Sequence, residues 1–317
     1  MRLLVLGGTG FVGRAVVTEA LTRGHHVTVL NRGHHPPPAG VTALTGDRTT
    51  PGGLDALTGH TFDAAVDTWS AAPRVVRDAA RALDGRAGHY TYISSRSVYL
   101  PAGPEPLTEA GPVCDGDPDA GGDVPYGEAK RGAELAADRE FGGPVLHARA
   151  GLILGPHEDI GRLPWWLHRL RHGGPALAPG PRDLPLQLID ARDLAAFVLD
   201  AAAAGLHGAY NTVSPPGHTT TGEILELANE VTGGHAELRW TGPEAILAAG
   251  IEPWTELPLW LPPGTEDYHL IHRGDVSKAL GAGLRCRPVR DTVADTWAWL
   301  TSLPGPAPQR ADRPAVG

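Results

Sequence analysis

Short runs of apolar residues alternate with helical patterns through the first half of the chain. The apolar runs cover residues 3–6, 26–30, 41–44, 64–67, 90–94 and 145–150. Helices are predicted between them at 11–23, 73–83 and 126–141. Continuous apolar runs separated by helices are typical of parallel strands that are buried on both faces and joined by right-handed crossovers. The pattern therefore predicts an α/β fold with a doubly wound parallel sheet.

In the second half of the chain the alternation loosens, and tryptophan and proline become more frequent. The apolar runs 186–189 and 209–213, with a predicted helix at 191–203, look like returns to the same sheet. Two more helices are predicted at 222–231 and 289–300. The second domain is therefore expected to be interleaved with the first rather than appended to it.

A glycine-rich sequence, GGTGFVG, joins the first apolar run to the first predicted helix. Gly7, Gly10 and Gly13 stand at this strand-to-helix turn. One glycine permits the tight turn, one lets backbone N–H groups approach a pyrophosphate, and one lets the helix pack closely on the strand. The turn therefore predicts a Rossmann dinucleotide site. The residues expected to contact the cofactor there are Gly7, Thr9, Gly10, Phe11, Val12 and Gly13.

These elements divide the chain into a dinucleotide-binding Rossmann domain and a smaller substrate-binding domain. We assign the first to residues 1–155, with returns to its sheet at about 185–213. The second, C-terminal domain comprises 156–184 and 214–301. The last residues, 302–317, are rich in proline and are predicted to form a disordered tail.

The end of the second predicted strand bears on which dinucleotide is bound. NAD-binding proteins usually place an Asp or Glu there, on the ribose hydroxyls, whereas this chain has Asn31 and Arg32. A guanidinium pairs with a 2′-phosphate that an acid would repel, so NADP is favoured over NAD as cofactor. The alternative is that Arg32 is a solvated loop residue. Asp47, after the third strand, is expected to hold the adenine amine unless it is an ordinary turn aspartate.

Tyr126 and Lys130 lie four residues apart, which places a phenol and an ammonium on one face of a helix. The chain has six tyrosines and only two lysines, so a chance match to this spacing is rare. A tyrosine that exchanges a proton near neutral pH needs a pKa well below its ordinary value of about 10. A lysine and an oxidised nicotinamide can together stabilise the phenolate, and the lysine can also donate to the nicotinamide ribose. The alternative is that Tyr126 and Lys130 form an ordinary surface pair without a catalytic role.

Three motifs carry a resemblance to a known family. The sequences GGTGFVG, ISSRSVY (93–99) and YGEAK (126–130) resemble the extended short-chain dehydrogenase/reductases, the NAD-dependent epimerase/dehydratase group. The later motifs RAGLILGP (149–156) and LIDARDL (188–194) are similar to that group as well. The resemblance thus covers nearly the whole chain.

The resemblance implies a Ser-Tyr-Lys catalytic set. The catalytic hydroxyl of the family lies four residues before the tyrosine of a Val-Tyr pair, which here gives Ser95, with Ser94 and Ser97 as alternatives. Tyr126 would then transfer the proton, Ser95 would polarise the substrate oxygen and Lys130 would tune the phenol. The family also implies a homodimer formed through helices at one edge of the sheet.

Three departures limit what the resemblance implies. Arg96 and Ser97 stand where sugar-nucleotide dehydratases have Asp-Glu acid/base residues, which disfavours a dehydratase. Sugar-nucleotide members use an arginine to hold the diphosphate, and Arg182 is displaced from that place by an altered sequence. The fourth strand ends in the polar sequence DTWS (67–70) instead of small apolar residues.

Composition narrows the class of protein further. The 317 residues carry a formal net charge of −9, which argues against nucleic acid or an anionic membrane as the main partner. The apolar run before Gly7 has only four residues, 3–6, and no apolar run is long enough to span a membrane. Two cysteines are too few for a disulfide framework, so a soluble cytoplasmic protein is expected. The histidines show no metal-ligand pattern, and no metal is predicted.

A long connection without periodicity, 101–125, precedes Tyr126. It carries six acidic residues: Glu105, Glu109, Asp115, Asp117, Asp119 and Asp123. A connection of this length in a compact domain is usually functional or disordered. We interpret it as an active-site flap, with a solvated acidic loop as the alternative.

The favoured interpretation is an NAD(P)-dependent oxidoreductase. Hydride would pass between NADP(H) and a carbonyl or hydroxyl carbon of a small molecule held between Ser95 and Tyr126. One alternative is a sugar-nucleotide epimerase that holds its cofactor tightly and shows no net redox change. Another is a non-catalytic NADP-binding regulatory protein, which the intact set of Ser95, Tyr126 and Lys130 disfavours.

Overall fold

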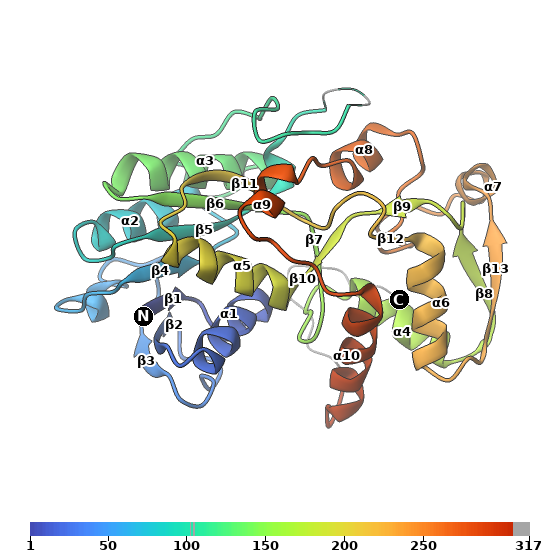
Figure 1. Cartoon of the computed structure of the whole chain (residues 1–317), viewed down its shortest axis with the longest axis horizontal. Coiled ribbons are helices and arrows are strands. Elements are labelled where there is room, and N and C mark those ends of the chain that lie inside the picture. The colour runs from blue at the N-terminus through green and yellow to red at the C-terminus, as the bar shows by residue number, and fades with distance from the viewer. Residues whose placement is uncertain (102, 104, 307–317) are drawn as a thin grey trace.

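Seven parallel strands form the central sheet of the computed structural model, which describes residues 1–101, 103 and 105–306 (Figure 1). In spatial order they are β11 (Gly208–Thr212), β6 (Val145–Ala150), β5 (Tyr90–Ser95), β4 (Ala64–Asp67), β1 (Arg2–Leu6), β2 (His26–Asn31) and β3 (Thr42–Thr45). All neighbouring strands in this sheet run parallel, which confirms the predicted doubly wound fold. The strand order reverses between β1 and β4, and ligands of such sheets bind at the carboxyl ends of the strands there.

Helices cover both faces of this sheet (Figure 1). They are α1 (Phe11–Thr22), α2 (Pro73–Leu83), α3 (Tyr126–Glu140) and α5 (Ala191–Ala203). α1 packs with α5 on one face, and α2 packs with α3 on the other. Alternate residues of β1 enter two cores, since Leu3 and Val5 contact the α1–α5 side whereas Leu4 and Leu6 contact the α2–α3 side. Burial on both faces explains why this strand is a continuous apolar run.

The C-terminal part has a hydrophobic core of its own, which includes the buried Trp166 and Trp260. Within the described residues its helices are α4 (Arg162–Arg171), α6 (Thr221–Val231), α7 (Pro243–Ala248), α8 (Glu266–His272) and α10 (Val289–Ser302). The short α9 (Ser277–Gly281) instead packs against β11 of the central sheet. The strands of the C-terminal part pair as β7 (Leu152–Leu154) with β10 (Leu188–Asp190), β8 (Gly174–Pro179) with β13 (Ala236–Thr241), and β9 (Pro185–Leu186) with β12 (Thr219–Thr220). Two short 3-10 helices lie in the N-terminal half of the described chain, η1 (Asp55–Leu57) and η2 (Arg96–Val98).

Only one of the two runs expected to rejoin the central sheet does so. The run 209–213 forms β11 beside β6. The run 186–189 instead forms parts of β9 and β10, which pair with β12 and β7 outside the seven-stranded sheet. That expectation was wrong because an apolar run indicates burial but not the partner strand. Ser302, which was assigned to the tail, ends α10, and residues 307–317 of the tail lie outside the described residues.

The described residues also bear on membrane and metal binding. No helix among them is long and apolar enough to cross a bilayer. Within the same residues, no three His, Cys, Asp or Glu side chains gather closely enough to hold a metal ion. Cys114 and Cys286 are both present as thiols.

Candidate active site

The glycine turn lies at the carboxyl end of β1, where the strand order reverses. Gly7 and Gly8 have φ angles of 120° and 91°, which other residues rarely adopt. A Cβ atom on Gly13 would lie 2.6 Å from the amide nitrogen of Gly8, so the first turn of α1 packs directly against the loop. A Cβ atom on Gly10 would meet nothing within 4 Å. The turn thus combines tight backbone, close helix packing and open space over Gly10.

The N-terminus of α1 is suited to an anion. Gly10 caps the helix without a side-chain hydrogen bond, and the first turn contains no acidic residue. N–H groups at a helix start, together with the positive end of the helix dipole, favour negatively charged groups such as pyrophosphate. Thr9 and Val12 are half-buried, whereas Phe11 is buried. The residues present therefore fit the phosphates of a dinucleotide.

Two hydrogen-bond donors, Asn31 at the end of β2 and Arg32 directly after it, stand where NAD-binding proteins usually have an acidic residue. Asn31 accepts a 2.8 Å hydrogen bond from the amide of Gly33, while its buried Nδ2 has no hydrogen-bond partner among the described residues. Arg32 is exposed. Asp47 accepts hydrogen bonds from the hydroxyl and amide of Thr49, at 2.7 and 3.0 Å, and these bonds hold the pKa of its carboxyl below the usual value. Asp47 thus closes its own turn near the two donors of the β2 end.

Lys130 is held in place by backbone carbonyls. The residue is buried in α3, one helical turn after Tyr126. Its Nζ donates to the carbonyl of Trp69 at 2.8 Å and to that of Ile93 at 2.7 Å. The same nitrogen lies 5.9 Å from the ring centre of Tyr126 and 4.7 Å from that of Tyr92. An ammonium therefore stands beside the phenol ring at the carboxyl ends of β4 and β5.

Tyr126 and the serine turn lie against each other. Tyr126 is the first residue of α3 and is 49% exposed. Ser95 ends β5, donates to the hydroxyl of Ser97 at 3.1 Å and accepts from the Ser97 amide at 3.1 Å. A Cβ atom on Gly127 would overlap the carbonyl oxygen of Ser97, so glycine lets α3 begin directly against the serine turn. The start of α3 is therefore packed against the serine turn, and the Tyr126 side chain is accessible to a ligand.

Ser94 has a different hydrogen-bond partner from Ser95 and Ser97. Its buried hydroxyl donates to Glu134 at 2.7 Å, and Glu134 forms two bonds to Arg149 at 2.9 and 2.8 Å. Burial opposes ionisation of Glu134, yet the hydrogen bonds from Arg149 and Ser94 and the nearby positive charge lower its pKa to about 2. This network ties α3 to β5 and β6. Of the three serines considered, Ser95 and Ser97 are the two in the turn beside α3.

The segment 67–70, which begins with the last residue of β4, lies between the glycine turn and α3. A Cβ atom on Gly7 would lie 2.6 Å from the Thr68 hydroxyl, and the neighbouring Trp69 carbonyl accepts from Lys130. The turn predicted to bind the cofactor and the predicted Tyr126–Lys130 pair are therefore neighbours in space. The polar DTWS sequence marked this loop as a departure from the family, but sequence reasoning assigned it no contact.

A comparison with models of known protein families supports the family that the sequence motifs indicated. The model of the NAD dependent epimerase/dehydratase family matches residues 3–212 of the chain. The chain belongs to this family. The match includes the glycine turn, the serine turn and the start of α3. The protein is accordingly an NAD(P)-dependent enzyme.

Solved structures of epimerases share this fold over nearly its whole length. UDP-glucose 4-epimerase of Thermus thermophilus, determined with NAD, has a TM-score of 0.69 and 20% identity and covers 95% of this chain and 99% of its own. WbmG of Bordetella bronchiseptica, determined with NAD and UDP, has a TM-score of 0.69 and 20% identity and covers 99% of both chains. At these identities the likeness establishes the fold alone.

A curated relative is similar over a shorter stretch. The 2′-dehydrokanamycin reductase of Streptomyces kanamyceticus is 36% identical over 115 residues. That stretch is 35% of this chain and 32% of the relative. The aligned part thus spans about a third of the curated protein.

In this epimerase/dehydratase family member an arginine follows the candidate catalytic serine. Arg96 is buried, and its Nη2 donates to the Leu270 carbonyl at 2.8 Å, whereas its Nε and Nη1 have no hydrogen-bond partner among the described residues. A Cβ atom on Gly274 would overlap the guanidinium, so glycine leaves room for it. Burial lowers the pKa of Arg96 to about 10. Arg96 therefore joins the serine turn to α8 of the C-terminal part.

The acidic connection that precedes α3 is tethered. Glu109 accepts a 2.8 Å hydrogen bond from the amide of Asn211 in β11. Asp119 is held by two arginines, Arg77 of α2 and Arg139 of α3, each at 2.8 Å. The described residues of this connection are thus fixed to the sheet edge and to two helices. The interpretation of the connection as an active-site flap stays a prediction, and these contacts show that Glu109 and Asp119 have partners on the sheet and the helices.

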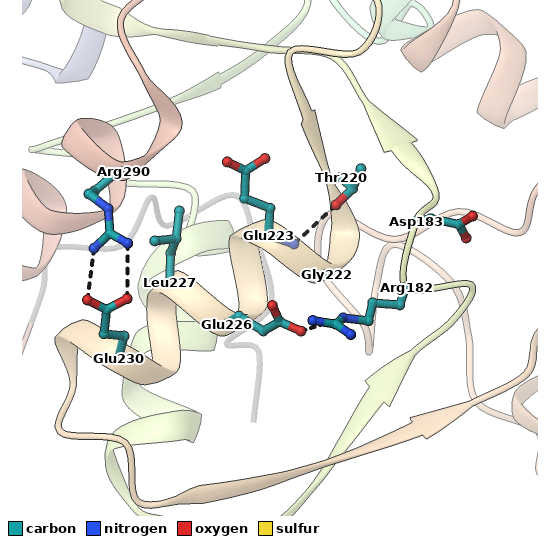
Figure 2. A pocket seen from close by; sticks show the side chains of 9 residues that line it. All are labelled: Arg182, Asp183, Thr220, Gly222, Glu223, Glu226, Leu227, Glu230 and Arg290. Carbon is teal, nitrogen blue, oxygen red and sulfur yellow. Dashed lines mark hydrogen bonds and ion pairs between the residues drawn. The ribbon is translucent and has the colours of Figure 1, made fainter.

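A hollow of about 700 Å³ lies in the C-terminal part along α6 (Figure 2). Two ion pairs stand on its wall, Arg182 with Glu226 at 2.6 Å and Arg290 with Glu230 at 2.9 Å. It shares no lining residue with the predicted cofactor or catalytic residues. Arg182 is therefore engaged by a glutamate in a separate hollow.

Proposed function

We propose that the protein is an NADPH-dependent reductase that acts on a carbonyl carbon of a small molecule. The observation that carries the proposal is the position of Lys130 and Tyr126 directly across the 67–70 loop from the glycine turn. The similarity to a 2′-dehydrokanamycin reductase supports the reducing direction. Arg96 and Ser97, in place of the acid/base pair of the dehydratases, also agree with a reductase.

The residues around the glycine turn would hold NADP(H). The start of α1 would receive the pyrophosphate, and Asp47 would hold the adenine amine. Asn31 contributes a buried amide donor without a partner among the described residues, and Arg32 contributes a guanidinium. Both are donors, which suit the acceptor oxygens of a 2′-phosphate. NADPH, when bound, supplies the hydride that reduces the carbonyl carbon.

Three side chains would polarise the substrate and transfer the proton. Ser95 donates a hydrogen bond to the substrate carbonyl oxygen and polarises it. Tyr126 gives its phenolic proton to that oxygen, which becomes the hydroxyl of the product. Lys130 stabilises the phenolate that is left on Tyr126. Because two carbonyls anchor Nζ, the ammonium keeps its place beside the ring during the transfer.

The decisive experiment follows NADPH absorbance with the purified protein and a panel of carbonyl compounds that includes 2′-dehydrokanamycin. We expect one NADPH to be oxidised per product formed. Tyr126→Phe should lower kcat by about 100-fold or more, since general acid catalysis is worth roughly that factor. The affinity for NADPH should remain unchanged, because the phenol acts on the substrate oxygen.

Other outcomes would identify the alternatives. Turnover with a tightly held cofactor and no net oxidation would indicate an epimerase. Full biological activity of Tyr126→Phe would indicate a regulatory NADP-binding protein. The homodimer that the family implies is a further proposal, which sedimentation velocity would test, and fractionation of cells would test the proposed cytoplasmic location.

A further inference from the structure

A largely buried ion pair joins Arg48 to Asp67, the first residue of the segment 67–70. Asp67 is 0% exposed, and its carboxylate accepts from Arg48 Nη1 at 2.8 Å and Arg48 Nη2 at 2.6 Å. It also accepts from the Trp69 amide at 2.9 Å and from the Tyr90 hydroxyl at 2.6 Å. These four bonds use the roughly four acceptor sites of a carboxylate. Because a buried ion pair adds little net stability, its presence points to a geometric role.

The ion pair fixes the residue whose carbonyl holds Lys130. The Trp69 amide donates to Asp67, and its indole N–H donates to the Ala72 carbonyl at 3.0 Å. The Arg48 guanidinium lies 5.5 Å from the centre of the Trp69 ring. Trp69 is therefore held through its amide, its indole N–H and its ring face. Its carbonyl, in turn, accepts from Lys130 at 2.8 Å.

We propose that the Arg48–Asp67 pair is a positioning device for the catalytic ammonium, because it fixes the Trp69 carbonyl and thereby the place of Lys130 beside Tyr126. This inference rests on the proposed function and deepens it. Arg48 directly follows Asp47, the proposed adenine contact, so the network reaches from one end of the cofactor site to the other. The proposed role of the ion pair also explains why the polar sequence DTWS (67–70) stands where the family is expected to have small apolar residues.

The titratable groups around the ammonium come from two elements. Tyr126 lies on its own helix and Tyr92 on β5, while Glu134 further along α3 is committed to Arg149. Burial, together with the charge of Asp67, raises the pKa of both Tyr90 and Tyr92 well above the usual value. These two phenols therefore stay neutral in the working pH range.

Asp67→Asn tests the device because it keeps the shape and removes the charge. We expect kcat to fall roughly 10- to 100-fold, as for a displaced catalytic group. The limb of the pH–rate profile that reports Tyr126 should move to higher pH, since a displaced ammonium stabilises the phenolate less. The Kd for NADP, measured by fluorescence titration, should rise several-fold because Lys130 is proposed to donate to the nicotinamide ribose.

The chain offers a closely matched control. Asp190 is 1% exposed, and its carboxylate accepts from the side chain and amide of Arg192 and from the hydroxyl of Thr292, the same kinds of donor that Asp67 has. Asp190→Asn should therefore lose comparable stability. Its pH limb and its Kd for NADP should match those of the wild type.

A milder variant keeps the proposal testable if Asp67→Asn does not fold. Tyr92→Phe removes the 3.1 Å bond to the Trp69 carbonyl and keeps the ring beneath Lys130. It should shift the pH limb in the same direction by a smaller amount. The proposal is overturned if Tyr126→Phe is inactive while each of these variants that folds keeps the wild-type limb and NADP affinity. An active Tyr126→Phe would instead overturn the proposed function itself.

Discussion

Arg32 should decide between the two nicotinamide cofactors. The residue is exposed beyond β2, where a guanidinium can pair with a 2′-phosphate and has no counterpart on NAD. Arg32→Ala should raise the Kd for NADP by about 10-fold or more, because a hydrogen bond to a charged group is worth about 1.5–3 kcal/mol. The Kd for NAD should change little. Fluorescence titration with both dinucleotides measures the two effects.

The exposed Arg290 provides the comparison for this prediction. It lies in the C-terminal part and pairs with Glu230, so Arg290→Ala removes an equal charge at a distance from the glycine turn. Its dinucleotide affinities should equal those of the wild type. An equal loss of NADP and NAD affinity in Arg32→Ala would contradict a 2′-phosphate contact and would make Arg32 a solvated loop residue.

At the scale of single residues, spacing in the sequence indicates side-chain chemistry but not backbone partners. Tyr126 and Lys130 are recognisable because their spacing is rare in a chain with two lysines. That Lys130 donates to the carbonyls of Trp69 and Ile93 could not be predicted, since every residue has a carbonyl and only the fold selects these two. The same holds for Ser94, whose partner Glu134 lies 40 residues further along the chain.

The start of α1 gives a prediction at the scale of an element. Gly13→Ala places a Cβ atom 2.6 Å from the Gly8 amide, so the helix must shift, and both stability and NADPH binding should fall. Gly10→Ala meets nothing within 4 Å, and its φ of −87° is open to alanine, so the melting temperature should stay within error of the wild type. NADPH binding should nevertheless weaken, because the methyl group occupies space that the cofactor is proposed to fill. A Gly10→Ala variant with undiminished affinity would place the phosphates elsewhere.

The anchoring of α3 gives a second prediction, for stability as a function of pH. Glu134 has a pKa of about 2, below that of the unfolded chain, so it adds stability above the unfolded value that is lost as pH falls through the folded one. Glu134→Gln should lower the free energy of unfolding at neutral pH by about 3 kcal/mol, because it leaves Arg149 buried without its partner. The deficit should shrink between about pH 4 and pH 2. Urea unfolding across this range measures it.

Ser94→Ala separates the charge from the hydrogen bond in this network. It removes one donor to Glu134 and keeps the ion pair, so the expected cost is about 1 kcal/mol. A deficit in Glu134→Gln that is constant with pH would mean that the carboxylate is not the stabilising form.

Elements with strong local patterns were predictable almost to the residue. The expected runs 64–67, 73–83, 145–150 and 191–203 coincide with β4, α2, β6 and α5. Each is long or buried on both faces, so its own sequence carries the pattern. The short strands of the C-terminal part were not predictable in this way. β8 and β13, for example, pair across about 60 residues in a proline-rich region, and only the packing of the whole part selects that pairing.

At the scale of the whole molecule, the chain passes between the two parts more than once. β6 of the central sheet leads into β7, and β10 leads through α5 back to β11. The C-terminal part nevertheless has its own hydrophobic core. The buried Arg96, bonded to the Leu270 carbonyl, joins the two parts next to the serine turn. Interleaving of this kind should make the parts unfold together although their cores are separate.

A thermal unfolding experiment with cofactor tests this coupling. A ligand that binds only the native state stabilises it by about 2.7 kcal/mol at 100 times its Kd. For a chain of this size that corresponds to a rise in Tm of roughly 5 °C. NADPH should give this shift in a single transition, and NADH at the same concentration should give a smaller one because it lacks the 2′-phosphate. Two transitions, of which only one responds to NADPH, would show that the C-terminal part unfolds independently and that contacts such as Arg96 with Leu270 do not couple it to the cofactor site.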